Sequence, residues 1–340
     1  MNTIAGAWPG ADLFGCSTAG DISGIQVSDD SLVVTAVRFE HTSVRGACTR
    51  IDGPQDSFIA GESLARTLLG DGLVHVFVLS DGLHVNGSAL VQGIASQLPP
   101  EVTVTGGLSG DGPRFQETLV LWNGAPAPRT IAAVGFYGSR LRIGYASLGG
   151  WDPFGPERLI TRSAGNVLYE LDGRSALDLY KTYLGPHASD LPASGLLFPL
   201  SIRTEIGDTP VVRTILSVDE NDQSMTFAGD LPVGSYARFM KANFDRLIDG
   251  AVGAARTSHV AVGASSPGFS PDLALLVSCV GRKLVLGQRV EEEVEGVREV
   301  LGERTVLAGF YSYGEISPFT PTARCELHNQ TMTITTLAEP

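Results

Sequence analysis

The segment Gly309-Phe-Tyr-Ser-Tyr-Gly314-Glu315-Ile316, near the C-terminus, gives the strongest indication of the architecture, because it recurs elsewhere in the chain. Residues 15–22, Gly-Cys-Ser-Thr-Ala-Gly-Asp-Ile, repeat its pattern without a gap: glycine, two residues, a hydroxyl, one residue, glycine, acid, isoleucine. A looser copy, one residue shorter, reads Gly-Gly-Leu-Ser-Gly-Asp-Gly at 106–112. Repetition inside one chain indicates a repeated structural unit. We expect the three Gly-hydroxyl-Gly-acid turns to line one shared cleft.

The second and third turns each end a longer repeated segment. The expected order in both is strand, helix, strand and turn, at residues 74–79, 86–97 and 102–105, and again at 273–277, 286–301 and 305–307. Each of the three turns is followed by an apolar, strand-like run: Leu32 to Val37, Thr118 to Trp122 and Met332 to Leu337. The sequence therefore predicts an α/β protein of two related lobes, with mixed sheets flanked by helices and a cleft between the lobes.

The first copy of the unit is shorter than the others. Only the first fourteen residues of the chain precede Gly15, too few for the strand and helix that precede the other two turns. Either the chain begins late, or its first unit is built differently.

Composition and charge exclude several classes of function. The formal net charge is −13, so neither nucleic acid nor an acidic membrane surface should attract the protein. No apolar stretch approaches the roughly 20 residues that span a bilayer, and the N-terminus does not read as a signal peptide. The four cysteines form no CxxC pair, which argues against a disulfide framework or a zinc site. We expect a cytoplasmic protein.

The region between the repeats carries a second set of signals. Residues 151–156 are rich in turn formers and predict a loop. Ser175 can cap a helix that stops at Gly185, and Ser235 can cap a longer helix from Tyr236 to about Ala254. Strands are expected at 213–218 and 224–227. We place a domain boundary near Gly173, which gives domains of residues 1–172 and 173–340.

Taken together, these segments resemble a FIST protein with its N-terminal and C-terminal domains in tandem. The resemblance rests on residues 15–22, 106–112, 166–173, 278–282, 309–316 and 327–333. It implies a sensory domain that binds a small ligand, an amino acid being one candidate, and that signals through an output domain on a partner protein. Some members resemble haem proteins that respond to nitric oxide. FIST proteins usually carry a strand and helix before the first turn motif, and this chain departs from that pattern.

The three turns supply the first candidate ligand contacts. Consecutive backbone N–H groups at a glycine turn can hold an anion, and acids beside them can accept from an ammonium group, a combination that suits an amino acid. The hydroxyls and acids in question are those of Ser17, Thr18, Ser109, Ser312, Asp21, Asp111 and Glu315, with Tyr311 and Tyr313 beside them. The alternative is that the acids merely cap neighbouring backbone.

Two further candidates follow apolar strands. Ser278-Cys279-Val-Gly281-Arg282 lies where a strand gives way to a helix, the place at which α/β folds favour ligands. Arg282 offers a planar fork for a carboxylate, and Asp81 takes the place of Cys279 in the earlier unit. The alternative for Cys279 is a small buried apolar residue.

His328 completes the candidate set. It stands in the polar run His-Asn-Gln-Thr, residues 328–331, where alternation would place His328 and Gln330 on one face. His328 is the first candidate for an axial haem ligand, with a hydrogen-bonded structural histidine as the alternative. Cys279, His328 and an acid can also imitate a thiol hydrolase.

We therefore predict a non-catalytic sensor of a small polar metabolite, with no metal and no required cofactor. A haem sensor and a cysteine-dependent hydrolase are the alternatives. The predicted ligand contacts are Ser17, Thr18, Asp81, Ser109, Cys279, Arg282, Tyr311, Tyr313, Glu315 and His328.

Overall fold

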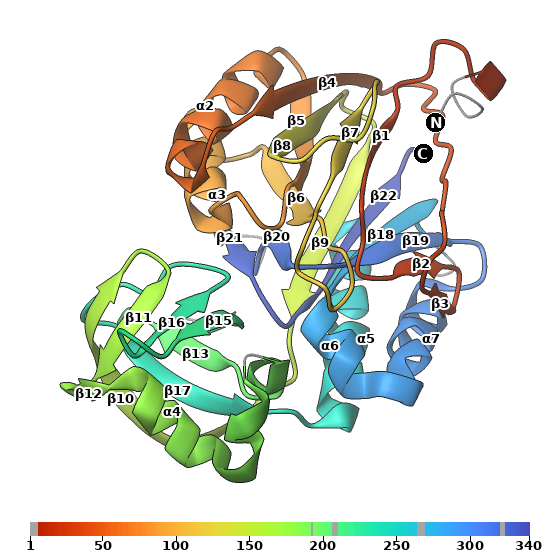
Figure 1. Ribbon diagram of the computed structural model, residues 1–340. Coiled ribbons are helices and arrows are strands. Elements are labelled where there is room, and N and C mark those ends of the chain that lie inside the picture. Colours follow the sequence, from red (N-terminus) through yellow and green to blue (C-terminus); the bar gives the residue numbers. More distant parts are fainter. Residues whose placement is uncertain (1–5, 192, 206–209, 264–268, 320–323) are drawn as a thin grey trace.

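Two six-stranded sheets form the main body of the protein (Figure 1), for which a computed structural model describes residues 6–191, 193–205, 210–263, 269–319 and 324–340. The first sheet has the order β21 (Cys325–His328), β20 (Gly314–Pro318), β6 (Thr103–Leu108), β5 (Leu73–Ser80), β8 (Thr130–Tyr137) and β4 (Ser43–Arg50). The second has the order β3 (Gln26–Ser28), β2 (Asp21–Ser23), β19 (Val306–Ser312), β18 (Leu273–Cys279), β22 (Met332–Ala338) and β9 (Arg142–Leu148).

The two sheets are copies of one plan. Each contains a single parallel pair, β5–β6 in the first and β18–β19 in the second, and its other pairs are antiparallel. Val78 pairs with Gly106 in one sheet, and Leu276 pairs with Gly309 in the other. At both positions an added Cβ would lie 1.9 Å from the backbone oxygen of the partner, so the same close approach requires glycine twice. The predicted α/β class and the repeated unit are confirmed.

Helices connect the parallel strands and cover the outer faces of the sheets (Figure 1). Helix α3 (Gly87–Gln97) begins after Asn86, whose side chain accepts from the Ala89 N–H, and it packs with α2 (Ser57–Leu68) on the first sheet. Helix α5 (Phe244–Ala261) covers the second sheet together with α7 (Val290–Leu301). The helix predicted at residues 286–301 begins only at Val290, because a separate helix, α6 (Val280–Leu286), precedes it and ends at Gly287, which has a φ of 55°. A 3₁₀ turn, Gly287–Arg289, follows.

The inner faces of the two sheets share one apolar core. Phe77 and Leu79 of the first sheet pack in the same cluster as Val277 and Leu337 of the second. The Thr335 hydroxyl also donates to the Thr105 hydroxyl, at 2.8 Å. The two related units therefore meet face to face as an αββα sandwich, and in the described part of the chain packed side chains occupy the place of the predicted cleft between them.

A separate lobe is inserted between the two units. Its eight-stranded antiparallel sheet contains β10 (Asp152–Ala164), β11 (Val167–Leu171), β12 (Arg174–Ser175), β13 (Leu200–Arg203), β14 (Val211–Arg213), β15 (Ile215–Asp219), β16 (Ser224–Phe227) and β17 (Tyr236–Lys241). Helix α4 (Ala176–Leu184) starts at Ser175, whose hydroxyl accepts from the Asp178 N–H, as predicted. Two 3₁₀ segments follow it, Gly185–Asp190 and Ala193–Leu197. The predicted boundary near Gly173 falls inside this lobe, between β11 and β12.

Several predicted elements differ in the structure. Residues 152–156 belong to β10 and are not a loop; the strand accommodates its prolines through an irregular register between Phe154 and Arg158. Tyr236–Lys241 is a strand, because Ala237 and Phe239 alternate into the core of the inserted lobe, and the helix after it is capped by Asn243 instead of Ser235. Two strands, β14 and β15, occupy the stretch 213–218 predicted as one.

The run Leu32 to Val37 is also not a strand. It belongs to residues 31–40, which pair with no strand and lead from β3 to β4 along the surface (Figure 1). In the described part of the chain, no helix is both long enough and apolar enough to cross a membrane.

Candidate functional site

The three Gly-hydroxyl-Gly-acid turns meet, because each one carries the chain from one sheet to another. Residues 309–316 leave the second sheet as β19 and enter the first as β20, whereas residues 15–22 link β1 (Phe14–Cys16) to β2 of the second sheet. Residues 106–112 leave β6, and the chain continues to β7 (Val120–Trp122), which pairs with β1. The turns are thus arranged in a cycle around the middle of the sandwich.

Backbone hydrogen bonds join the turns directly to one another. The Gly110 N–H donates to Ser17 O at 3.0 Å, the Ala19 N–H to Tyr311 O at 2.8 Å, and the Tyr313 N–H to Leu108 O at 3.2 Å. The predicted convergence is therefore correct. The turns pack against each other, however, and their backbone donors are used within the protein, so they do not form an open anion cradle.

The side chains of the first two turns are also engaged internally. Thr18 donates its hydroxyl to Asp21 at 2.8 Å, and the Ser17 hydroxyl accepts from the Leu119 N–H at 2.9 Å. Asp111 accepts from three backbone N–H groups, at residues 115, 116 and 117, and from the Tyr313 hydroxyl. For Asp21 and Asp111 the alternative reading, acids that anchor their surroundings, describes the structure.

Asp81 has the same kind of role. It is fully buried and accepts from the backbone N–H groups of Leu83, His84 and Arg129 and from the Thr118 hydroxyl. Burial alone would raise its pKa, but these bonds outweigh burial and hold the pKa below the ordinary value. Asp81 is therefore an ionised anchor that shapes the loop after β5.

Arg282 is engaged by other groups of the protein. Its guanidinium has no exposed surface and forms an ion pair of 2.7 Å with Glu293. It also donates to Gly149 O at 2.8 Å and to Leu247 O at 2.7 Å. Glu293 in turn accepts from Tyr311 and Ser278. Arg282 and Tyr311 thus belong to a closed network that joins α6, α7 and β19.

Glu315 is the most unusual titratable group in this region. It is fully buried at the start of β20 and accepts from the Ser312 hydroxyl at 2.6 Å, and from the Thr331 N–H and hydroxyl at 3.1 and 3.0 Å. Burial nevertheless dominates and raises its pKa from 4.5 to about 8. The carboxyl is therefore mostly protonated at neutral pH.

Cys279 lies near Glu315 at the end of β18. Its thiol is buried, and burial raises its pKa well above the ordinary value. Because the thiolate is the reactive form of cysteine, this environment suppresses nucleophilic chemistry. Cys279 therefore matches the alternative considered for it, a small buried apolar residue.

His328 is enclosed and does not fit haem. Its Nε2 is 2.7 Å from Ser317 O, its Nδ1 has no partner among the described residues, and Phe319 packs against the ring. Burial lowers its pKa to about 4, so the imidazole is neutral. Neutral imidazole suits a metal, but the two cavities described below are not lined by His328 and are smaller than pockets that hold large ligands.

The expected alternation after His328 is also absent, because Asn329 and Gln330 form a turn and Gln330 has a φ of 64°. All of residues 328–331 are buried. Among the described residues, Asn329 Oδ1, Gln330 Oε1 and the Ser109 hydroxyl have no hydrogen-bond partner. Buried polar atoms of this kind are rare in folded proteins and point to an unseen partner such as water or a ligand.

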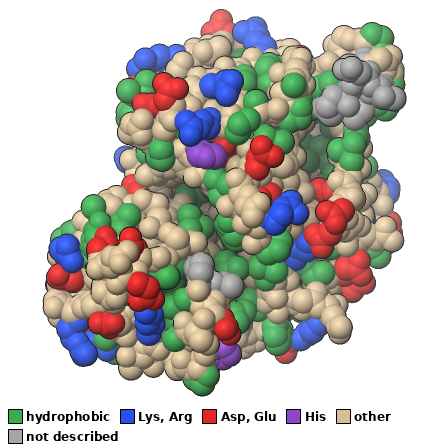
Figure 2. Space-filling view, in the orientation of Figure 1, with side chains coloured by type: hydrophobic (Ala, Val, Ile, Leu, Met, Phe, Trp, Pro, Cys, Tyr) green, Lys and Arg blue, Asp and Glu red, His purple; other side chains and the backbone are tan. Residues whose placement is uncertain are grey.

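A cleft of about 100 Å³ lies where the sandwich meets the inserted lobe. The hollow between the two bodies is visible in Figure 2. On the sandwich side it is lined by Gly82, Leu83, Leu108 and Tyr313, and on the lobe side by Asn166, Leu216, Phe227 and Ala228. Ser109 follows Leu108 in the chain, and Asn329 donates to the backbone oxygen of Tyr313 at 3.3 Å, so both residues adjoin residues that line the cleft.

Specific polar contacts hold the inserted lobe against the sandwich. The Arg213 guanidinium donates to Leu327 O at 2.8 Å, Asn86 donates to Asp230 at 3.0 Å, and Gln330 donates to Leu196 O at 3.3 Å. Arg213 is buried, and burial lowers its pKa to about 10. The connections are directional, so a small change of lobe position breaks them.

Of the predicted ligand contacts, only Tyr313 lines the cleft, and Ser109 adjoins a residue that lines it. Sequence reasoning missed Glu293, Arg213 and the residues of the inserted lobe. Glu293 could have been found, since it lies on the apolar face of its helix, at i+3 from Val290 and i−4 from Val297. Arg213 carried no such signal, because its partner is more than a hundred residues away.

Comparison with known proteins accounts for nearly the whole chain. The sequence model of the FIST N domain matches residues 1–174, and that of the FIST C domain matches residues 176–318. An uncharacterized protein of Methanocaldococcus jannaschii is 21% identical over 313 residues, which are 84% of this chain and 58% of that protein. The crystal structure of a cyanuric acid hydrolase from A. caulinodans aligns over 88% of this chain and 99% of its own, with 11% identity and a TM-score of 0.20, too low to support any inference.

Proposed function

Because this chain belongs to the FIST family, with an N domain and a C domain in tandem, we propose that it binds a small polar ligand without turning it over. FIST domains are associated with sensory roles in signal transduction. We assign the ligand to the cleft between the sandwich and the inserted lobe. An amino acid is the first class to test, because the cleft is too small for a large ligand and has asparagine and tyrosine side chains in its wall.

The observation that carries this proposal is the composition of the cleft. Its two walls come from two bodies, and Ser109 and Asn329, whose side chains carry unpartnered buried polar atoms, adjoin Leu108 and Tyr313 of the wall. A ligand that contacts both walls favours one position of the inserted lobe over others. Ligands shift a conformational equilibrium only through such a difference in affinity.

In this proposal the bound ligand is signalled by the position of the inserted lobe relative to the sandwich. The Arg213–Leu327 and Asn86–Asp230 hydrogen bonds report that position, since they bridge the two bodies. A partner protein that carries the output domain reads the change. In this proposal the buried network of Arg282, Glu293 and Tyr311 keeps the sandwich rigid while the lobe moves.

Thermal unfolding of the purified protein with each of the common amino acids tests the proposal. We expect at least one to raise the melting temperature of the wild type and to leave Leu216→Trp unchanged, because the indole fills the cleft from the lobe side. Ser217→Trp is the matched control, since Ser217 is the exposed neighbour on the same strand.

Four other results would contradict part or all of this proposal. A shift retained by Leu216→Trp but lost in Ser217→Trp would place the ligand elsewhere. A protein insensitive to the whole panel would remove amino acids as the ligand. A purified protein with a Soret band lost in His328→Ala would favour haem instead, and turnover of an ester or amide that is lost in Cys279→Ala would favour the hydrolase.

A further inference from the structure

A second cavity lies at the opposite side of the sandwich from the inserted lobe. It has a volume of about 220 Å³ and is bordered by residues 37–40 and by the C-terminal end of β22. Its floor is apolar, because Leu141, Leu273 and Leu337 line it. Figure 2 shows a hollow with a hydrophobic floor on this side of the molecule. None of the residues assigned to the ligand cleft takes part in it.

Residues 37–40 form one wall of the cavity. They belong to a segment whose sequence is typical of a strand but which pairs with no strand. Residues 31–40 read Ser-Leu-Val-Val-Thr-Ala-Val-Arg-Phe-Glu, and we call them the β3–β4 linker. Leu32 is 74% exposed, Val34 51% and Val37 50%. Valine, a β-branched residue, favours strands, and an unpaired strand-like backbone is a template for another chain.

Three carboxylates surround the apolar floor, those of Glu40, Asp272 and Glu339. Glu339 accepts from the backbone N–H groups of Glu40 and His41 and from the Thr42 hydroxyl, and the Thr42 bond is the largest of the effects that hold its pKa below the ordinary value. Asp272 accepts from the Glu339 N–H at 3.1 Å. These donors are neutral, so the negative charge of the group is not cancelled by them.

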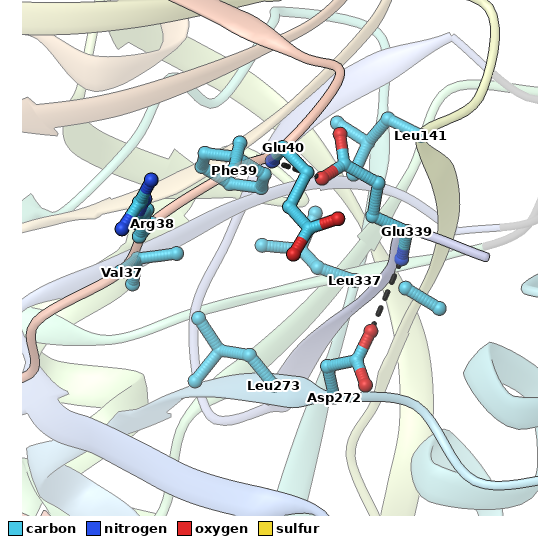
Figure 3. Close-up of a pocket in the computed structure, with 10 residues that line it drawn as sticks. Val37, Arg38, Phe39, Glu40, Leu141, Asp272, Leu273, Leu337 and Glu339 are labelled. Atoms are coloured by element: carbon cyan, nitrogen blue, oxygen red, sulfur yellow. Dashed lines mark hydrogen bonds between the residues drawn. The ribbon is translucent and has the colours of Figure 1, made fainter.

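Glu40 is the carboxylate aimed into the cavity. Figure 3 shows its carboxylate over the Leu337 side chain, whereas the Arg38 side chain extends away from the acids. A lysine or arginine side chain can place its aliphatic stem on the leucine floor and its cationic end among the carboxylates. The cavity therefore matches a side chain that is apolar along its length and positive at its tip.

From these features we infer that the β3–β4 linker and the adjacent cavity bind an extended, basic and apolar segment of a partner protein. The segment adds as a strand beside the linker and inserts a lysine or arginine side chain into the cavity. A second copy of this chain is a poor occupant, because each copy has a net charge of −13 and two such copies repel each other. The linker and the cavity form the surface through which the proposed sensor contacts its signalling partner. Binding of the segment does not depend on the proposed sensory function, but its role in signalling rests on that function.

Fluorescence anisotropy with a labelled eight-residue peptide of alternating lysine and valine tests this inference. We expect the full-length protein to bind this peptide and not the corresponding glutamate–valine peptide, and to bind a lysine–serine peptide at least tenfold more weakly. Glu40→Lys should weaken binding of the lysine–valine peptide at least tenfold. Thr35→Pro should do the same, since it removes a backbone N–H from the middle of the linker.

Matched controls separate this site from general attraction to an acidic protein. Asp190→Lys makes the same change in net charge on the exposed surface of the inserted lobe, and we expect it to alter the affinity less than twofold. Leu216→Trp, which blocks the ligand cleft, should also leave peptide binding intact. Failure of the ligand proposal and failure of this one are therefore distinguishable.

Three results would overturn the inference. The first is absence of binding of the lysine–valine peptide to the wild type at millimolar concentration. The second is equal loss of affinity in Glu40→Lys and Asp190→Lys, which would mean non-specific attraction. The third is a wild-type dimer in sedimentation that becomes monomeric in Thr35→Pro, which would make a second copy the occupant of the linker.

Discussion

Glu315→Gln is the substitution that most directly tests the physical description of the turn region. Glu315 is fully buried, and its oxygens accept from Ser312 and Thr331. Glutamine has nearly the same shape and resembles the protonated carboxyl, because it offers one acceptor and one donor. Its oxygen can keep the Thr331 bonds while its NH₂ group donates to the Ser312 hydroxyl.

The sign of the pH effect follows from the direction of the pKa shift. The folded protein raises the pKa of Glu315 from 4.5 to about 8, so between these values the folded state binds a proton that the unfolded state has released. The stabilising contribution is complete below pH 4.5 and is lost as the pH rises to about 8. At ~1.4 kcal/mol per pH unit, the loss between pH 5 and pH 8 is on the order of 4 kcal/mol.

Urea unfolding at intervals between pH 5 and pH 8.5 measures this contribution. The free energy of unfolding of the wild type should fall relative to that of Glu315→Gln as the pH rises, because the glutamine does not titrate. Glu299→Gln is the control, since Glu299 is an exposed glutamate of α7. A wild type and a Glu315→Gln variant with parallel pH profiles would refute a buried, mostly protonated Glu315.

Three further predictions concern other parts of the buried network and the turns. Arg282→Ala should lower the free energy of unfolding by about 3–5 kcal/mol in urea titrations, because it leaves Glu293 buried without its cation, and Arg282→Met combined with Glu293→Leu should recover most of that loss. Gly309→Ala should destabilise by about 1–3 kcal/mol or prevent folding, since the added Cβ would lie 1.9 Å from Leu276 O, whereas Gly15→Ala, where nothing lies within 4 Å, should be nearly neutral in thermal unfolding. Iodoacetamide at pH 8 should label exposed Cys48 before buried Cys279 in mass spectrometry; early labelling of Cys279 would contradict the raised pKa of its thiol.

Local signals predicted the helices whose ends are marked in the sequence. Ser175 caps α4 as expected, and the helix predicted from residue 86 begins after Asn86, which caps it, because capping depends on residues only three positions apart. The same reasoning failed at Ser235, which precedes apolar residues with helical spacing. There Tyr236–Lys241 pairs as β17 with β10 and β13, and those tertiary pairings override the local helical pattern.

The candidate ligand residues show where sequence reasoning stops. The candidate acids were recognised as important, yet their partners are distant: Asp111 bonds Tyr313, and Asp81 bonds Arg129. The residue types are the same whether an acid binds a ligand or anchors the backbone. Only the positions of the surrounding donors distinguish the two roles.

The three turn sequences were sufficient to establish repetition, the α/β class and the meeting of the turns, because copies of one unit share one backbone path. The sequence did not reveal that the units exchange strands, that the sandwich is closed, or that the cleft lies against an inserted lobe. These features depend on contacts between residues more than a hundred positions apart, such as Gly110 with Tyr313 and Arg213 with Leu327. Periodicity and capping are properties of neighbours along the chain, and they carry no information about such contacts.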